Sequence, residues 1–302
     1  QALANNPDLR SAALNVKKAE AALMSARLAY APTLALSPQG TVSSWDKGKA
    51  TQTYSLPVTA SWQIDLFGQI LNPKRGAQVS LKQTQVYEQA VQSQVIANVA
   101  NMYYTLLMLD RQLQITESTA DILKKNVETV EAMKDAGIYN TTSAGVEQTR
   151  AAYAQVLASL PGMRQSIRDT ENSLCLMLNQ PAQEIERGVL EYQQLPTEFS
   201  AGIPLQLLSN RPDVKAAEMS LAASYYDTNS ARAAFYPQIT LSGSAGWTNS
   251  AGSAIMNPGK LLASAIGSLT QPLFYRGANI ARLKPAKAQE EQSKILYQTT
   301  LL

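Results

Sequence analysis

The chain lacks the residues on which much enzymatic and metal chemistry depends. Its 302 residues include no histidine and one cysteine, Cys175. These counts exclude histidine metal sites, Ser-His-Asp and Cys-His catalysis, and a disulfide within the chain. Cys175 lies in the apolar run 174–178, so we expect a buried thiol that serves packing. We therefore predict no catalytic residue, no cofactor and no metal site.

The chain also lacks a marked excess of either positive or negative charge. The 26 basic and 23 acidic residues leave a net charge of +3, with no block of like charge. This balance suggests neither a nucleic-acid partner nor a polybasic membrane anchor, so we expect no nucleic acid to bind. The uncharged run 89–109 is interrupted by Gln92, Gln94, Asn98 and Asn101, so we expect no membrane-spanning helix there.

An internal repeat at an offset of 205 residues is the most informative feature present, and it aligns Asn5 with Asn210. Between positions 5 and 37, eleven aligned residues are identical, where ordinary composition would give about two. In each copy a helical stretch ends at a proline, Pro32 or Pro237, and strand-like sequence follows. A duplicated unit without obvious chemistry favours an architectural function.

A long helix with a coiled-coil seam is predicted from Gly68 to about Ala136. At 1.5 Å per residue it would reach about 100 Å. Ten of eleven seam positions are apolar, in strict 4,3 spacing over five heptads, which is typical of a left-handed coiled coil. The seam positions are Val95, Val99, Met102, Leu106, Leu109, Leu113, Thr116, Ala120, Leu123, Val127 and Val130.

The pattern then breaks and resumes on a return helix. Gly137 suits a helix C′ position with a positive φ, and Asn140 or Thr141 can cap the next helix. We therefore expect an antiparallel helical hairpin over 68–179, in which Pro161 kinks or breaks the return helix. The return seam consists of Val146, Thr149, Tyr153, Val156, Leu160, Met163, Ile167, Thr170, Leu174 and Met177.

Residues 54–66 alternate between apolar and polar side chains, and this length suffices for a tilted transmembrane strand, which needs about 9–11 residues. A similar pattern starts at Ile239, and 33–45 and 262–274 are expected to complete one strand hairpin per copy. The apolar set, predicted to face lipid, is Tyr54, Leu56, Val58, Ala60, Trp62 and Ile64. The polar set, predicted to face a lumen, is Ser55, Thr59, Ser61 and Gln63.

A soluble sheet with one wet face would give the same alternation. A membrane is favoured because the polar face is almost uncharged, and because Trp45, Tyr54, Trp62 and Trp247 lie where an interfacial girdle would place them. Four strands cannot close a barrel, and lipid does not tolerate an open edge. Two copies would give about eight strands and a filled interior, whereas three would give about twelve and the beginning of a lumen.

Several motifs occur in a recognisable order along the chain. They are RPDVKAAE at 211–218, ARAAFYPQITL at 231–241, WQIDLFG at 62–68, QPLF followed by Gly277, and TENSL at 170–174. These motifs span essentially the whole chain, and they resemble those of the outer-membrane factors, the TolC and OprM type of efflux channel.

The resemblance implies a mixed α and β fold in a homotrimer. Each protomer would give four strands to a twelve-stranded transmembrane barrel in contact with outer-membrane lipid, and long coiled-coil hairpins to a periplasmic tunnel. The implied function is passive export of small molecules such as drugs, received from a periplasmic adaptor and an inner-membrane pump of the RND or ABC type. The residues implied at the adaptor-docking tip are Ala136, Gly137 and Ile138. The residues implied at the junction of barrel and helices are Asp65, Phe67, Gly68, Phe274 and Gly277.

The chain is thereby divided into a first repeat, 1–179, a connector, 180–208, and a second repeat, 209–302. Only 26 residues follow Arg276, so from the repeat we expect most of a second hairpin, about 85 residues, to be absent from this chain. The first residue is Gln1 rather than Met, and we expect the chain to be a piece of a mature protein. Within these parts we expect helices over 6–31 and 211–236, strands within 33–66 and 237–274, and the start of a second hairpin at 276–302.

Two other functions are weighed against the channel. A periplasmic adaptor also carries a helical hairpin, but it flanks the hairpin with half-motifs of a lipoyl-like domain and lacks the duplication. An enzyme would need a cluster of reactive groups, whereas the charged residues at Asp8, Asp65, Asp213, Arg27 and Arg232 recur in duplicate or lie at the ends of elements. We therefore predict that the chain is not an enzyme.

Overall fold

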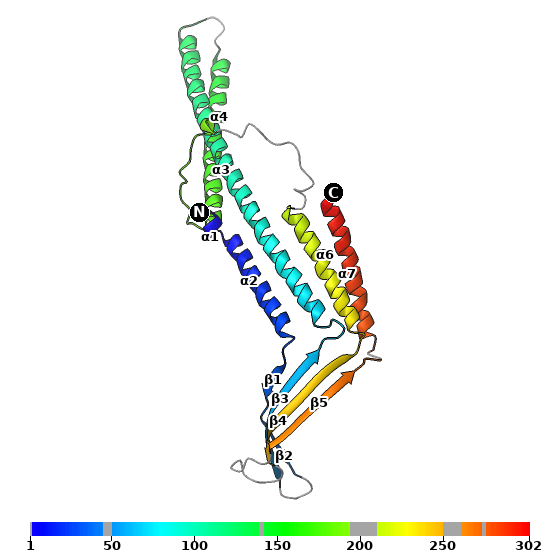
Figure 1. Ribbon diagram of the computed structural model, residues 1–302. Coiled ribbons are helices and arrows are strands. Elements are labelled where there is room, and N and C mark those ends of the chain that lie inside the picture. Colours follow the sequence, from blue (N-terminus) through cyan, green and yellow to red (C-terminus); the bar gives the residue numbers. More distant parts are fainter. Residues whose placement is uncertain (1, 45–49, 139–141, 194–209, 250–260, 274–275) are drawn as a thin grey trace. The chain divides into compact units, whose positions relative to one another are not determined.

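The chain forms two compact units, one made of Gln1–Ala13 and Glu88–Ile203 and the other of Leu14–Tyr87 and Pro204–Leu302. The computed structural model describes residues 2–44, 50–138, 142–193, 210–249, 261–273 and 276–302 (Figure 1).

The helix α3 (Leu71–Asp135) begins in the second unit, and from Glu88 onward it forms an antiparallel hairpin in the first unit with α4 (Ser143–Met177). The predicted seam is confirmed, because every seam position on both helices is buried or half-buried. Leu106, Ile167 and Leu174 form the buried core of the hairpin. Burial of one continuous apolar face stabilises helices that would be marginal in isolation.

One local prediction on the return helix needs correction, and another is tested only in part. The N-cap of α4 is Thr142, whose Oγ1 accepts a hydrogen bond from the Gly145 backbone N–H at 3.2 Å. The expected caps, Asn140 and Thr141, lie outside the described residues. Pro161 lies inside α4, which continues past it, so the expected break is absent and the kink stays a prediction. Its side chain is exposed, so the seam on the other face holds the helix together where proline removes one backbone donor.

The first unit also holds α1 (Ala2–Asn5), the short 3₁₀ helix η1 (Leu190–Tyr192) and the start of α2 (Pro7–Leu28). The buried side chain of Asn6 begins α2, because its Oδ1 accepts hydrogen bonds from the backbone N–H groups of Asp8 and Leu9 at 2.9 and 3.0 Å. Its Nδ2 donates to the Met177 carbonyl at 3.0 Å, which ties this helix start to the end of α4.

The second unit contains an antiparallel sheet with the order β1-β3-β4-β5, in which β2 also pairs with β3. The described residues form five strands where four were expected. The pairs Leu36↔Val58 and Gln39↔Ser55 belong to the same register of pairing with β3. The strands β1 and β2 are therefore two segments of one strand position. Proline has no backbone N–H for the ladder, which explains the interruption at Pro38. The strands are β1 (Thr33–Leu36), β2 (Gln39–Ser43), β3 (Thr51–Ile64), β4 (Gln238–Asn249) and β5 (Leu261–Thr270).

Two further helices, α6 (Pro212–Ala233) and α7 (Ala278–Leu301), pack together in the second unit. The buried face of α6 consists mostly of alanine, serine and threonine, which allows close approach. The Thr228 hydroxyl donates to the carbonyl of Ala286 at 3.2 Å, directly after the helix-interior Pro285. None of the described helices combines the length and the apolar character that crossing a membrane would require.

Candidate functional site

Strand pairing turns the alternation of β3 into two continuous faces of the sheet. Residues directly opposite each other in an antiparallel pair point to the same face. The apolar pairs are Leu36↔Val58, Leu34↔Ala60, Leu56↔Trp247, Val58↔Ala245, Trp62↔Leu241, Ile64↔Ile239 and Ile239↔Leu269. The polar pairs are Ser55↔Thr248, Thr59↔Ser244, Ser61↔Ser242, Gln63↔Thr240 and Ser244↔Ser264.

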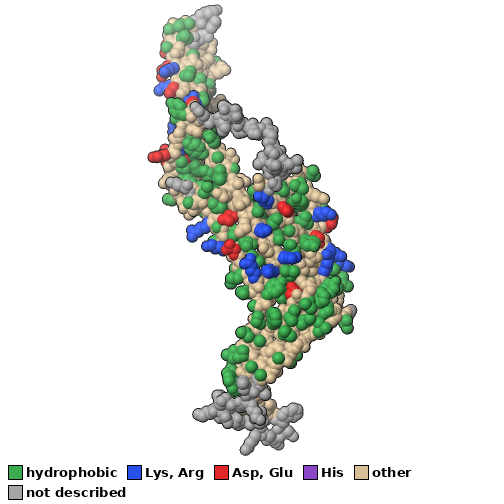
Figure 2. Space-filling view, viewed as in Figure 1, with side chains coloured by type: hydrophobic (Ala, Val, Ile, Leu, Met, Phe, Trp, Pro, Cys, Tyr) green, Lys and Arg blue, Asp and Glu red, His purple; other side chains and the backbone are tan. Residues whose placement is uncertain are grey.

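The polar face carries hydroxyl and amide groups instead of charges. The five strands contain no Asp, Glu, Lys or Arg. Figure 2 agrees, since the charged side chains on the face shown lie over the helices and the ends of the strands. The Ser244 and Ser264 hydroxyls are 2.8 Å apart, and Thr59 Oγ1 donates to the Ala35 carbonyl at 3.3 Å. This face also carries the apolar residues Ala35, opposite Thr59, and Pro57. The largest described apolar side chain on it is Ile266, which is opposite Ser242 and is largely exposed.

The junction between β3 and α3 is organised by Asp65. Its carboxylate accepts hydrogen bonds from the backbone N–H groups of Gln69, Ile70 and Leu71 at 2.7, 3.1 and 2.7 Å. These donors have no partner within the helix, so Asp65 satisfies three groups at the end where the helix dipole is positive. The sequence places Asp65 at this junction but does not reveal its capping role.

Aromatic and amide groups complete the junction. Phe67 stacks on Tyr236 with ring centroids 5.0 Å apart and an interplanar angle of 11°. Gln69 donates to the Ala233 carbonyl at 3.0 Å. The Trp62 indole N–H donates to the Tyr30 carbonyl at 2.9 Å. Partial burial, followed by the nearby Asp65 carboxylate, raises the pKa of the Tyr30 phenol.

Two glycines at the junctions have positive φ angles. Gly68 has φ +81°, and Gly277 has φ +75° and forms the N-cap of α7. Glycine adopts this region without the steric penalty that a Cβ imposes. Phe274, the remaining residue predicted for the junction, lies outside the described residues, as does Trp45.

The end of α3 has the geometry predicted for Gly137. Its φ is +66°, its N–H donates to the Lys134 carbonyl at 3.0 Å, and the Ile138 N–H donates to the Met133 carbonyl at 3.1 Å. This pair of bonds is a Schellman motif, which satisfies the last carbonyls of a helix. Ala136, Gly137 and Ile138 are exposed, and a Cβ on Gly137 would meet no atom within 4 Å.

A groove lies beside this end of α3. Its volume is about 570 Å³, and its lining residues are Lys125, Glu128, Thr129, Ala132, Met133 and Ile138. The exposed tip therefore adjoins a surface with both apolar and charged groups.

Long paired helices and a charge-free, two-faced sheet define the fold class of the outer-membrane channels. A structure described as a membrane protein from Pseudomonas aeruginosa superimposes with a TM-score of 0.89 at 26% identity, covering 99% of this chain and 72% of that one. A crystal structure of CusC gives a TM-score of 0.85 at 27% identity, covering 99% of this chain and 70% of that one.

The chain belongs to the outer membrane efflux protein family, whose sequence pattern matches residues 1–180 and 203–302. The cation efflux system protein CusC of Escherichia coli O6:H1 is 30% identical over 305 residues, which cover 99% of this chain and 65% of CusC. The pyoverdine export outer membrane protein OpmQ of Pseudomonas aeruginosa is 29% identical, covering 100% of this chain and 66% of OpmQ. The chain thus spans slightly less than two thirds of the length of these relatives. Membership in the family assigns it to the outer membrane.

Proposed function

We propose that the chain forms the outer-membrane channel of a tripartite export system and acts as a passive duct for small molecules. The observation that carries this proposal is the separation of an apolar face from an uncharged polar face across all four strand positions. The apolar face, with Leu56, Val58 and Trp62 of β3, would contact lipid. The polar face, with Thr59 and Ser61, would line a water-filled lumen.

A homotrimer is the assembly that fits these strands. Among the described strands, β5 pairs only with β4, and β1 and β2 pair only with β3, so both sides of the sheet lack a neighbour. Three copies of four strand positions would close a twelve-stranded barrel without an exposed edge.

The helices also present a surface for further packing. Met108, Ile115 and Ile122 recur every seven residues on α3, away from the seam, and are 50%, 53% and 67% exposed. A second stripe at heptad spacing supports lateral packing against another helix in the assembly.

An internal duplication is supported by the bounds of the elements. α6 begins and ends 205 residues after α2 (212 − 7 and 233 − 28), and β4 begins 205 residues after β1 (238 − 33). Each copy would then supply half of the strands of one protomer, as expected from a repeated unit that builds a larger assembly.

The partners would be a periplasmic adaptor at the tip of the hairpin and an inner-membrane pump that supplies the energy. The exposed residues 136–138 and the adjoining groove support a docking surface there. Relatives are named for export of cations, pyoverdine and solvents. Small molecules of this range, drugs among them, are the proposed substrates.

The mass of the detergent-solubilised particle tests the assembly. We expect three copies of the chain, together with single-channel conductance after reconstitution into a bilayer. A stable monomer without conductance would exclude both the barrel and the duct.

A further inference from the structure

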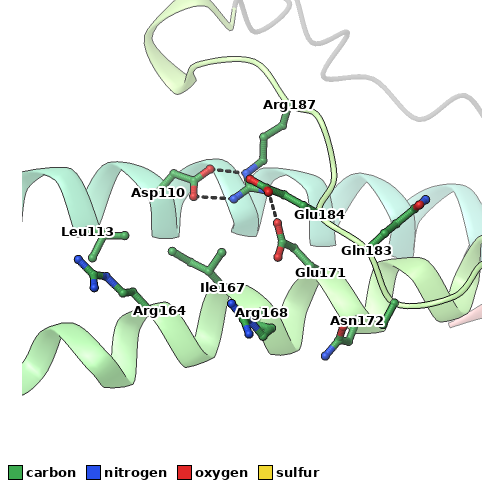
Figure 3. A pocket seen from close by; sticks show the side chains of 11 residues that line it. Asp110, Leu113, Arg164, Ile167, Arg168, Glu171, Asn172, Gln183, Glu184 and Arg187 are labelled. Atoms are coloured by element: carbon green, nitrogen blue, oxygen red, sulfur yellow. Dashed lines mark hydrogen bonds and ion pairs between the residues drawn. The ribbon is translucent and has the colours of Figure 1, made fainter.

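A half-buried arginine joins the segment after α4 to both helices of the hairpin. Arg187 lies in this segment and lines a cavity of about 630 Å³ together with Asp110 of α3 and Glu171 of α4 (Figure 3). Its Nε and Nη2 donate to the two carboxylate oxygens of Asp110 at 2.5 and 2.9 Å. Its Nη1 donates to Glu171 and to the Ile185 carbonyl. One guanidinium thus holds a carboxylate from each helix.

The contact is largely withdrawn from water. The side chains of Arg187 and Glu171 are only 14% and 11% exposed, and that of Asp110 is 36% exposed. The hydrogen bonds that Arg187 donates to Asp110, followed by the one it donates to Glu171, raise the pKa of Arg187 against the opposing effect of burial. Removing one member of such a buried group leaves uncompensated charge, which is far more damaging than losing an exposed pair. Without Arg187, the carboxylates of Asp110 and Glu171 would repel each other across the hairpin.

Neighbouring contacts hold the same segment across both helices. Ile185 packs on the buried core formed by Leu106, Ile167 and Leu174. The Gly188 N–H donates to the Tyr103 hydroxyl of α3 at 3.3 Å. On the α4 side, the Cys175 thiol donates to the Gln183 carbonyl at 3.4 Å. Residues 183–191, here called the strap, therefore contact both helices beside their core.

Closer to the tip, the ion pairs between the helices are exposed. Arg164 binds Glu117 at 2.9 Å with side chains 64% and 45% exposed, and Arg150 binds Glu131 at 2.6 Å with side chains 53% and 36% exposed. Exposed pairs contribute little, because water screens them and two long side chains lose freedom. The charged contacts are thus strongest at the strap and weaker between the strap and residue 138.

We propose that Arg187 is a positioning residue that fixes the distance between α3 and α4 at the strap. The portion of the hairpin between the strap and the tip is then the portion in which the two helices can separate. In the proposed channel, the strap marks the position along the hairpin beyond which the helical duct can widen. In this one respect the inference rests on the proposed function. The repulsion between Asp110 and Glu171 is the force that Arg187 suppresses.

Hydrogen exchange of the full chain in detergent, read by mass spectrometry, tests the strap directly. Arg187→Gln should speed the exchange of amides in 106–113 and 167–175 by about tenfold or more, because local opening becomes easier. Adding Asp110→Asn and Glu171→Gln to Arg187→Gln should restore most of the protection, since the repelling charges are then gone. The matched control is Arg111→Gln, which removes two exposed contacts, the pair of Arg111 with Glu191 and its hydrogen bond to Gln114, and should change exchange by less than about twofold.

The exchange rates of these variants distinguish a positioning role of Arg187 from a contact that only adds stability. Unchanged exchange in Arg187→Gln, or a triple variant as fast as Arg187→Gln, would overturn the proposal. A leak assay in cells then tests the proposed duct independently of the proposed role of the strap. Faster exchange with increased uptake of a large antibiotic supports both, whereas faster exchange without uptake retains the strap and counts against the duct.

Discussion

Gly246 lies directly opposite Pro57 in the pairing of β3 with β4, at a distance that leaves no room for a side chain. A Cβ on Gly246 would be 2.4 Å from the Leu56 carbonyl oxygen and 2.5 Å from the Pro57 Cα. The Pro57 carbonyl accepts a hydrogen bond from the Ser37 N–H at 3.1 Å, so the backbone donor that proline lacks would face the first strand rather than Gly246. Gly246 is required on the other side of β3 because the two backbones approach closely there.

Gly246→Ala should therefore destabilise the sheet by about 1–3 kcal/mol, as overpacking does in closely packed regions. Gly243→Ala is the matched control, because its Cβ would be 3.6 Å from the Ser264 carbonyl oxygen, an ordinary contact. Denaturant unfolding of the detergent-solubilised protein measures both. Equal losses in the two variants would mean that the clash at Gly246 is relieved by backbone movement.

The two faces of β3 should respond differently to charge. Val58→Lys or Ala60→Lys should impair membrane assembly by about 2–4 kcal/mol if these positions face the middle of the bilayer. Thr59→Lys or Ser61→Lys should assemble and change conductance instead, because a lumen hydrates the added charge. Assembly yield and single-channel current measure the two effects. The same tolerance at all four positions would indicate a soluble sheet.

Loss of the Asp65 carboxylate should weaken the start of α3. Asp65→Ala removes the acceptor of three backbone N–H groups and should lower the free energy of unfolding by about 1–2 kcal/mol. Asp8→Ala is a suitable control, since Asp8 lies in the first turn of α2, where Asn6 is the cap. Its effect should be about 0.5 kcal/mol. Comparable losses in urea unfolding would show that the cap adds nothing beyond helix-dipole electrostatics.

A bulky side chain at Gly137 should block docking of an adaptor without disturbing assembly. Gly137→Trp places an indole in open space at the end of α3, where no atom lies within 4 Å of an added Cβ. Gly137→Asn is the control, because asparagine tolerates a positive φ and is small. Drug accumulation in cells, crosslinking to the adaptor and the level of trimer measure the effect.

Only the tryptophan variant should lose export and crosslinking while its trimer level stays normal. If both variants retain export, and a change at Lys125 abolishes it, the adaptor docks along the side of α3 rather than at its tip.

The features that could be predicted from the sequence are those with a short period. The spacing from Val95 to Val130 and the alternation from Tyr54 to Ile64 repeat within a few residues, so each element carries its own signal. Gly137 was also predictable, since an αL residue after a long helix is usually glycine.

Contacts between distant residues left no such signal. Arg187 lies in a segment without periodicity, 77 residues from Asp110, and nothing near it in the sequence marks its partners. The division of the first strand depends on Pro38 and on the register with Val58, which only the paired structure reveals. The role of Asp65 likewise depends on how the backbone turns into α3.

The absence of charge from the five strands has a consequence for acid tolerance. Tyr54 is their only titratable side chain, and they hold no carboxyl, amine or imidazole group. Acidification of the surroundings therefore adds no proton to the sheet, and the linkage between proton binding and stability vanishes for it. In the described part of the chain, sensitivity to acid therefore comes from carboxylates outside the strands, and we expect strand pairing to keep its strength when the medium outside the cell becomes acidic.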